Sequence, residues 1–79
     1  MIGKWQQNSY DDWCLTDGDG SYVISPDDEY GWNVWYFVYD RTGGVVGEVF
    51  LATANELLNA KFFAEQDYRA AMAQERILA

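Results

Sequence analysis

Acidic side chains are concentrated in the first half of this 79-residue chain, and one dense run lies between Asp17 and Asp28. Asp17, Asp19 and Ser21 occupy the first, third and fifth places of a twelve-residue calcium loop, and Asp28 occupies the last. The sixth place requires glycine for a sharp turn but holds Tyr22, and the last requires the longer side chain of glutamate. Because Asp-Gly pairs are common hairpin residues, we expect a tight turn here in preference to a calcium site.

Groups that support catalysis are scarce. The sequence contains no histidine and a single cysteine, so the commonest general base and the commonest zinc ligand are missing. Cys14 lies between Trp13 and Leu15 and has no basic neighbour in sequence, which indicates a small packed side chain. The glycines between Gly43 and Gly47 lack the lysine and the following helix of a phosphate-binding loop. We therefore expect a binding protein without catalytic residues, cofactor or metal.

The charge of the chain is strongly asymmetric. Thirteen acids and five bases give a formal charge of −8, and residues 1–40 hold eight of the acids but only one base, Lys4. Such a chain repels nucleic acid and anionic membranes and is attracted to basic surfaces. The acids recur at successive predicted turns, which lie at 11–12, 17–19, 27–29 and 40.

Turn residues divide the first fifty positions into short apolar segments that predict strands. The expected strands are Trp5–Asn8 and Asp12–Leu15, which could be one interrupted strand, followed by Tyr22–Ser25, Trp32–Asp40 and Val45–Leu51. In a meander, alternate turns lie at the same end of the sheet. The turns at 17–19 and 40–41 would then share one end, and those at 11–12 and 27–29 the other.

One long helix is expected after the strands. Thr53 and Glu56 match a capping box, and no Gly or Pro follows, which predicts a helix from about Ala54 to Ile77. Strands followed by a helix indicate a single α+β domain, with four to five antiparallel strands in residues 1–51 and the helical segment in 53–78. The helix face expected to meet the sheet comprises Leu57, Ala60, Ala64, Tyr68 and Ala71, with Met72 beside it.

The segment Trp32–Asp40 is apolar on both faces of the predicted sheet. If a loop of two or four residues follows it, Tyr36 pairs with Val49, Val34 with Leu51 and Val38 with Gly47. That uncharged face is expected to meet the helix, with Gly47 leaving room for the helix backbone. The other face should lie nearer water, because a buried Glu48 without a partner is costly. It would carry Asn33, Trp35, Phe37, Tyr39, Val46, Glu48 and Phe50.

The exposed aromatic face leaves two alternatives open. It is either an interaction surface or is covered by the N-terminal segment, with Trp5 and Tyr10. Leu58, Phe62 and Phe63 fall on the flanks of the helix stripe and could add a dimer contact.

No apolar run is long enough to span a membrane, and the N-terminal residues do not form a signal-peptide pattern. Together with the single cysteine, this favours a cytoplasmic location, in a bacterial host if the gene is carried by a phage.

In length, acidity and strands-then-helix order, the chain resembles the small accessory proteins of bacteriophages and mobile elements, and most closely the anti-CRISPR proteins. The resemblance implies an inhibitor that blocks a basic DNA-binding surface of a CRISPR effector subunit, with no direct binding to nucleic acid or membrane. Carboxylates on a continuous surface could imitate phosphates for such a partner. The expected contacts are Asp11, Asp12, Asp17, Asp19, Asp27, Asp28 and Glu29, with Tyr30 and Trp35 as anchors. The chain would be a monomer or homodimer, and the alternative function is a structural domain that assembles through its aromatic surface.

Overall fold

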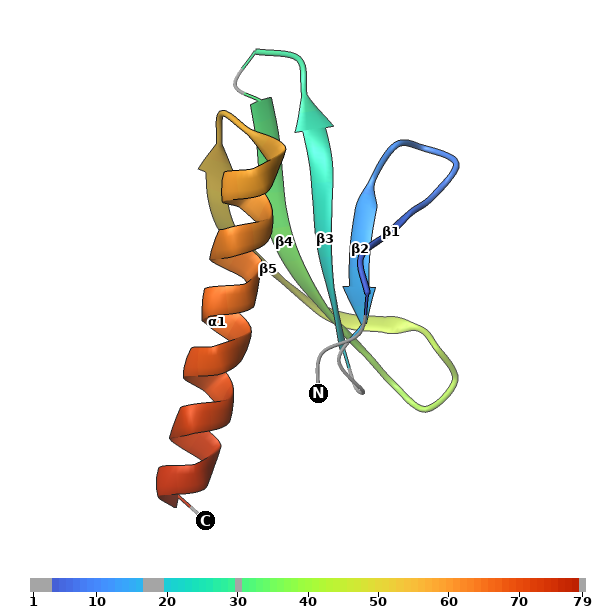
Figure 1. The fold of residues 1–79 in the computed structure, drawn as a ribbon. Helices are drawn as coiled ribbons and strands as arrows, with labels where there is room; N and C mark the ends of the chain where they lie inside the picture. Colours follow the sequence, from blue (N-terminus) through green and yellow to red (C-terminus); the bar gives the residue numbers. More distant parts are fainter. Residues whose placement is uncertain (1–3, 17–19, 30, 79) are drawn as a thin grey trace.

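The computed structural model describes residues 4–16, 20–29 and 31–78. They form a five-stranded antiparallel sheet in the order β1-β2-β3-β4-β5, followed by one helix, α1 (Figure 1). The strand order equals the chain order, so the sheet is a meander and the predicted α+β fold is confirmed. The elements are β1 (Gln6–Gln7), β2 (Trp13–Thr16), β3 (Gly20–Asp27), β4 (Gly31–Tyr39), β5 (Val45–Ala54) and α1 (Leu57–Leu78).

Helix α1 packs on one face of β3, β4 and β5 (Figure 1). Ala60 and Ala64 are fully buried there, because their short side chains let the helix approach the sheet closely. The sheet side of the core includes Leu15, Ile24 and Val34, all with no exposed surface. Burial of each such side chain contributes about 1.5–3 kcal/mol. Leu57 and Tyr68 pack beside this core, as the predicted helix stripe requires.

The last part of the predicted stripe does not reach the core. Ala71 is exposed and Met72 is 37% exposed. The C-terminal half of α1 extends past the end of the sheet in Figure 1, so no strand covers these positions. The apolar face of the helix is therefore longer than the part of the sheet on which it packs.

The predicted capping box does not form. Thr53 belongs to β5, and its hydroxyl donates a hydrogen bond to Oδ1 of Asn33 at 3.1 Å. The helix begins later than predicted, where the carbonyl of Glu56 accepts a hydrogen bond from the amide of Ala60. Pairing with β4 therefore extends β5 through the residues that were expected to start the helix.

The register of β4 and β5 confirms two of the three predicted pairs. Tyr36 lies opposite Val49 and Val38 opposite Gly47, but Val34 lies opposite Ala52. A bulge at Leu51 shifts the register there. The connecting loop has five residues, 40–44, and not two or four as predicted. A second irregularity between Val38 and Tyr39 shifts the pairing by one residue, so the strand pairs beyond it match those predicted for an even-numbered loop.

The role expected for Gly47 was wrong. A Cβ atom at this position would have the Cβ of Val38 as its nearest neighbour, at 3.9 Å, and no helix atom within 4 Å. A close approach occurs instead at Gly20, where a Cβ atom would lie 2.7 Å from the carbonyl oxygen of Phe37 and would overlap the ring of Tyr36.

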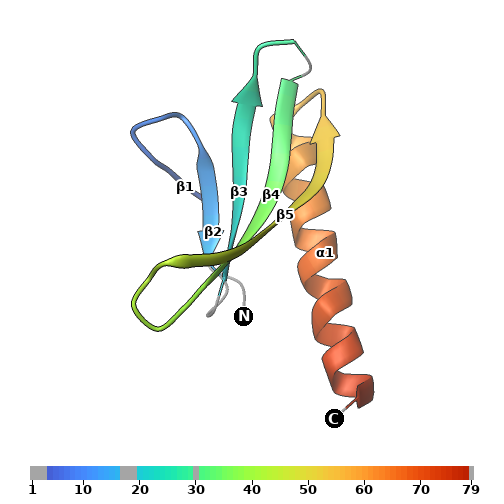
Figure 2. The ribbon, with the colours of Figure 1, turned by 180° about the vertical axis from the view of Figure 1, so that it is seen from behind.

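The sheet face opposite the helix is seen in Figure 2. The strands twist so strongly that the turn end of the β4–β5 hairpin lies on the β2 side of the molecule (Figures 1 and 2). Trp5 and Tyr10, which were the residues expected to cover this face, do not cover it. Trp5 packs beside the core and donates its indole N–H to Oε1 of Glu65 on α1, while Tyr10 is 80% exposed.

Candidate partner-binding site

Two acidic turns lie at the same end of the sheet, as predicted (Figure 1). The β1–β2 turn carries Asp11 and Asp12, and its shape depends on Asn8. The side-chain oxygen of Asn8 accepts hydrogen bonds from the amides of Tyr10 at 2.8 Å and Asp12 at 3.0 Å. Asp11 has a φ of 64° and is exposed, so the turn directs its carboxylate to solvent without using it as a hydrogen-bond acceptor.

The β3–β4 turn divides its acids between structure and solvent. Asp27 Oδ1 accepts the amide of Glu29 at 2.8 Å, and Asp27 Oδ2 accepts the side-chain amide of Asn33 at 3.0 Å. Asp27 therefore shapes the turn. Asp28 and Glu29 are exposed, and neither forms an ion pair within the described part of the chain. They are the carboxylates of this turn that remain available to a partner.

At the opposite end of the sheet, Asp40 shapes the β4–β5 turn. Its Oδ1 accepts hydrogen bonds from the amides of Thr42 and Gly44, both at 2.9 Å, and from the Thr42 hydroxyl at 2.7 Å. The Thr42 hydroxyl, followed by these amides, lowers the pKa of Asp40 below its ordinary value. Asp17 and Asp19, which were predicted to share this end, and the proposed anchor Tyr30, lie outside the described residues.

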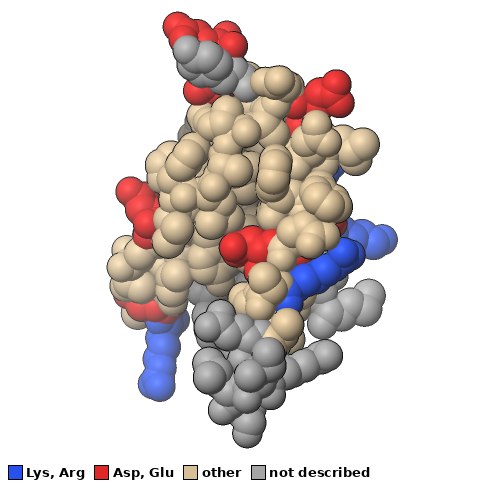
Figure 3. All heavy atoms as spheres, turned by 90° about the vertical axis from the view of Figure 1, so that its left-hand side faces the viewer, with Lys and Arg blue, Asp and Glu red and all other residues tan. Residues whose placement is uncertain are grey.

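The acidic side chains do not merge into one surface on the side of the molecule drawn in Figure 3. Red groups are separated there by uncharged atoms and by Lys or Arg side chains. The continuous acidic surface expected from the sequence is therefore absent from this side. The fold does place two acidic turns at one end of the sheet, and their residues 8–12 and 28–29 include no Lys or Arg.

Aromatic side chains form a cluster on the sheet face opposite the helix, which we call the open face. The Trp35 and Phe37 rings are nearly parallel, at 17°, with centroids 6.3 Å apart. The rings of Phe50 and Trp35 form a T-shaped pair with centroids 5.0 Å apart, and Phe50 is 50% exposed. Glu48 lies directly opposite Phe37 and is also exposed. The predicted anchor Trp35 thus lies in a cluster with Phe37, Glu48 and Phe50. These three residues were placed on the correct face of the sheet from the sequence, but they were not among the expected partner contacts.

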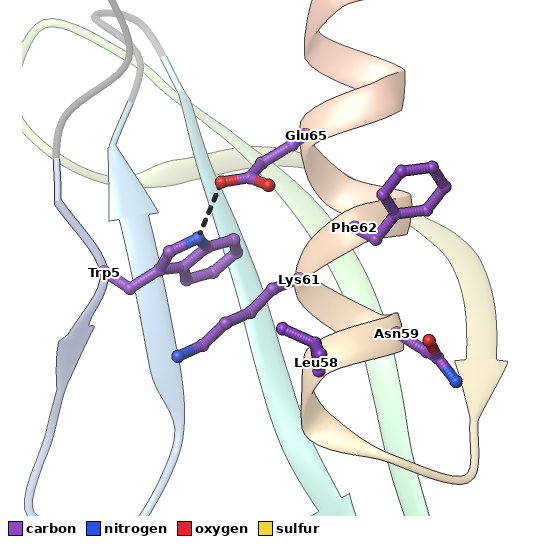
Figure 4. A pocket seen from close by; sticks show the side chains of 6 residues that line it. All are labelled: Trp5, Leu58, Asn59, Lys61, Phe62 and Glu65. Atoms are coloured by element: carbon purple, nitrogen blue, oxygen red, sulfur yellow. Dashed lines mark hydrogen bonds between the residues drawn. The ribbon is translucent and has the colours of Figure 1, made fainter.

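A hollow of about 420 Å³ lies between the segment before β1 and the first turns of α1 (Figure 4). Trp5 closes one side through its 3.4 Å hydrogen bond to Glu65. Lys61 extends from α1 so that its ammonium group lies 4.0 Å from the centroid of the Trp13 ring. Leu58 and Phe62 complete the wall and are 76% and 56% exposed. The sequence placed these two on a helix flank but contained no indication that Trp5 would join them.

Cys14 is half-buried in β2. Burial, and secondarily the nearby carboxylate of Asp12, raise the pKa of its thiol. Both effects reduce the fraction of reactive thiolate at neutral pH.

The calcium interpretation does not match the fold. Residues 20–27 form a continuous strand, so Ser21 and Asp28 stand roughly 20 Å apart instead of converging on one ion. Among residues 4–16, 20–29 and 31–78, no three His, Cys, Asp or Glu side chains are grouped closely enough to hold a metal. Within the same residues, no helix has the length and apolar character needed to cross a membrane.

Comparison with protein families, with curated proteins and with solved structures finds no match to this chain.

Proposed function

We propose that this protein is a non-catalytic inhibitor of the anti-CRISPR type, which acts in the bacterial cytoplasm by covering a basic, nucleic-acid-binding surface of a CRISPR effector complex. The observation that carries the proposal is the sheet end where Asp11, Asp12, Asp28 and Glu29 lie in two hairpin turns on the same side of the sheet, without a Lys or Arg in either turn. Backbone amides donate hydrogen bonds to the side-chain oxygens of Asn8 and Asp27, and these bonds hold the two turns in shape.

The mechanism follows from electrostatics. A net charge of −8 attracts the protein to a cationic groove from a distance and accelerates encounter. At contact, the exposed carboxylates of the sheet end take positions that phosphates of the nucleic acid would otherwise occupy. Because the turns are already ordered by hydrogen bonds, little conformational entropy is lost when they bind.

The test is a competition assay. Purified CRISPR effector complexes of several types are mixed with a labelled target duplex, and increasing amounts of the protein are added while DNA binding is followed by gel mobility. We expect inhibition at 50 mM NaCl that weakens as salt increases to 300 mM. The double variant Asp28→Asn and Glu29→Gln should require about tenfold more protein for the same effect.

A charge-matched control separates local contact from overall charge. Ala70 and Ala73 are exposed on α1, and replacing both with Lys changes the net charge by the same two units. This control should inhibit nearly as well as the wild type. Absence of inhibition with every effector, or equal loss in both double variants, contradicts the proposal.

Homo-oligomerisation through the open face is the second candidate function. The contact among Trp35, Phe37 and Phe50 favours it, because aromatic side chains exposed together on a small protein often mark an interface. Sedimentation of the wild type would then give a dimer or larger species. Trp35→Ala should lower that mass, and Phe62→Ala tests the helix flank in the same way.

A further inference from the structure

We propose that the open face binds an arginine side chain of the partner protein, with Trp35, Phe37 and Phe50 as the apolar platform and Glu48 as the anionic group. This inference rests on the proposed function in one respect, since it assumes that the partner presents a basic surface. It assigns to that partner a specific contact that is separate from the acidic sheet end.

The platform is ordered by its own contacts. Trp35 and Phe37 are two residues apart in β4, so their side chains lie on the same face. The rings of Phe37 and Phe50 both lie near the Trp35 ring, with centroids 6.3 Å and 5.0 Å from it. Trp35 and Phe37 are partly buried and Phe50 is 50% exposed, so a planar cation can stack on the ring surface that remains accessible.

Glu48 supplies the charge. It lies directly opposite Phe37 in the β4–β5 ladder, which places its Cβ about 5 Å from that of Phe37. Glu48 forms no hydrogen bond or ion pair within the described part of the chain. A guanidinium group can stack on the aromatic rings and donate two parallel hydrogen bonds to the unpaired carboxylate beside them.

The composition of the sheet indicates that the cation must come from another molecule. None of the five strands contains Lys or Arg. If two copies of this face packed together, both Glu48 carboxylates would lose water without gaining a cation from either sheet, which is unfavourable. Nucleic acid is repelled by the same charge. A basic protein segment is the occupant that matches this surface.

Arginine fits better than lysine for a geometric reason. The guanidinium group is planar and weakly hydrated, whereas the ammonium group of lysine is compact and strongly hydrated. Both basic side chains are attracted to aromatic rings, but only the guanidinium group can stack flat on a ring and also donate two parallel hydrogen bonds to a carboxylate. An arginine peptide should therefore bind about threefold more tightly than its lysine counterpart.

The experiment uses the capped peptide Gly-Arg-Gly-Gly-Arg-Gly and the same peptide with Lys at both basic positions. The protein has four tryptophans, so four indole N–H resonances can be followed by NMR and assigned with single Trp→Phe variants. We expect the arginine peptide to shift the Trp35 resonance more than the other three, and its affinity to be about threefold higher than that of the lysine peptide.

Matched variants separate this site from the acidic turns. Glu48→Gln and Asp28→Asn each remove one exposed carboxylate. Glu48→Gln should abolish the preference for arginine, whereas Asp28→Asn should weaken both peptides equally and leave the preference intact. Phe37→Leu tests the platform, and its melting temperature shows whether the fold persists. If Phe37→Leu does not fold, the Glu48→Gln comparison decides.

The outcomes distinguish this inference from the proposed function. Equal binding of the two peptides, or equal effects of Glu48→Gln and Asp28→Asn, overturns the arginine site even if effector inhibition remains. A wild-type dimer that Trp35→Ala converts to monomer also overturns it, because the face would then be occupied by a second copy. A clear arginine preference without inhibition of any effector contradicts the proposed function alone.

Discussion

Individual residues in this protein have structural roles that their exposure does not indicate. Asp27 and Asp40 lie in turns, as surface acids usually do, yet each accepts hydrogen bonds that fix the geometry of its turn. The carboxylates of Asp28 and Glu29, next to Asp27 in sequence, accept no such bonds in the described structure. Neighbouring carboxylates therefore differ in whether they are available to a partner.

The hydrogen bonds of Asp40 predict a pH dependence. Because its pKa is lowered in the folded state, the charged form stabilises the fold above the unfolded-state pKa of about 3.9, and this contribution is lost as pH falls through the lower folded-state pKa. Asp40→Asn retains an acceptor oxygen but not the charge. Its melting temperature should be lower than that of the wild type at pH 6, and the difference should disappear in strong acid. A difference that is unchanged with pH would contradict this account.

Two glycines give a matched test of close packing. At Gly20 a methyl group would meet the backbone carbonyl of Phe37 at 2.7 Å, and a backbone atom cannot move aside easily. Gly20→Ala should destabilise the protein by about 1–3 kcal/mol in urea unfolding. At Gly47 the nearest contact is an ordinary 3.9 Å, so Gly47→Ala should be neutral or slightly stabilising. Similar losses of stability at both positions would show that the loss comes from replacing any glycine in a strand, and not from the contact with Tyr36 and Phe37.

At the scale of elements, the helix and the sheet are joined mainly by small residues. Ala60 and Ala64 are fully buried positions of α1, and Tyr22 of β3 donates its hydroxyl to Oδ2 of Asp67 at 2.8 Å. This polar contact lies near the edge of the helix–sheet interface, where it fixes orientation more than it adds free energy.

The alanine contact predicts a steep size dependence. Ala64→Leu adds three carbons at a position with no exposed surface and should destabilise the fold by about 1–3 kcal/mol. Ala70→Leu adds the same atoms to the same helix at an exposed position, where surface changes usually stay within about 0.5 kcal/mol. Both are measured by chemical unfolding. Equal effects would mean that the helix does not pack on the sheet through Ala64.

At the scale of the whole molecule, charge is the dominant property. Thirteen acids face five bases in 79 residues, and one of the bases, Lys61, interacts with the Trp13 ring. Repulsion among the excess carboxylates opposes folding, since like charges in a small volume raise the free energy of the folded state.

Salt should therefore stabilise the free protein while it weakens binding to a basic partner. Raising NaCl from 10 mM to 500 mM shortens the screening length to a few ångströms, and the melting temperature should increase by about 2–5 °C. Charge reversal at Glu29→Lys should reduce this increase. A melting temperature that falls with salt would indicate that attractive ion pairs, rather than repulsion, dominate the fold.

The local pattern of the sequence was sufficient for much of the architecture. Turn residues and the apolar segments between them predicted the meander and the pairs of Tyr36 with Val49 and of Val38 with Gly47, and the absence of charge identified the face that meets the helix. For the candidate site, the sequence correctly placed the acids of two turns at one sheet end and Trp35 on the open face. These features follow from periodicity and charge, which are properties of the sequence itself.

Features that depend on contacts between distant residues could not be predicted. Threonine is suited both to a helix N-cap and to a strand, and Thr53 is part of the strand because it pairs with Asn33 of β4. The bulge at Leu51 and the contact between Trp5 and Glu65 likewise arise only when strands and helix meet. The sequence by itself determined which segments form strands and helix and how charge is distributed. The tertiary structure decided which carboxylates are committed to hydrogen bonds and which face water, because each hydrogen-bond partner is provided by the folded arrangement of the chain.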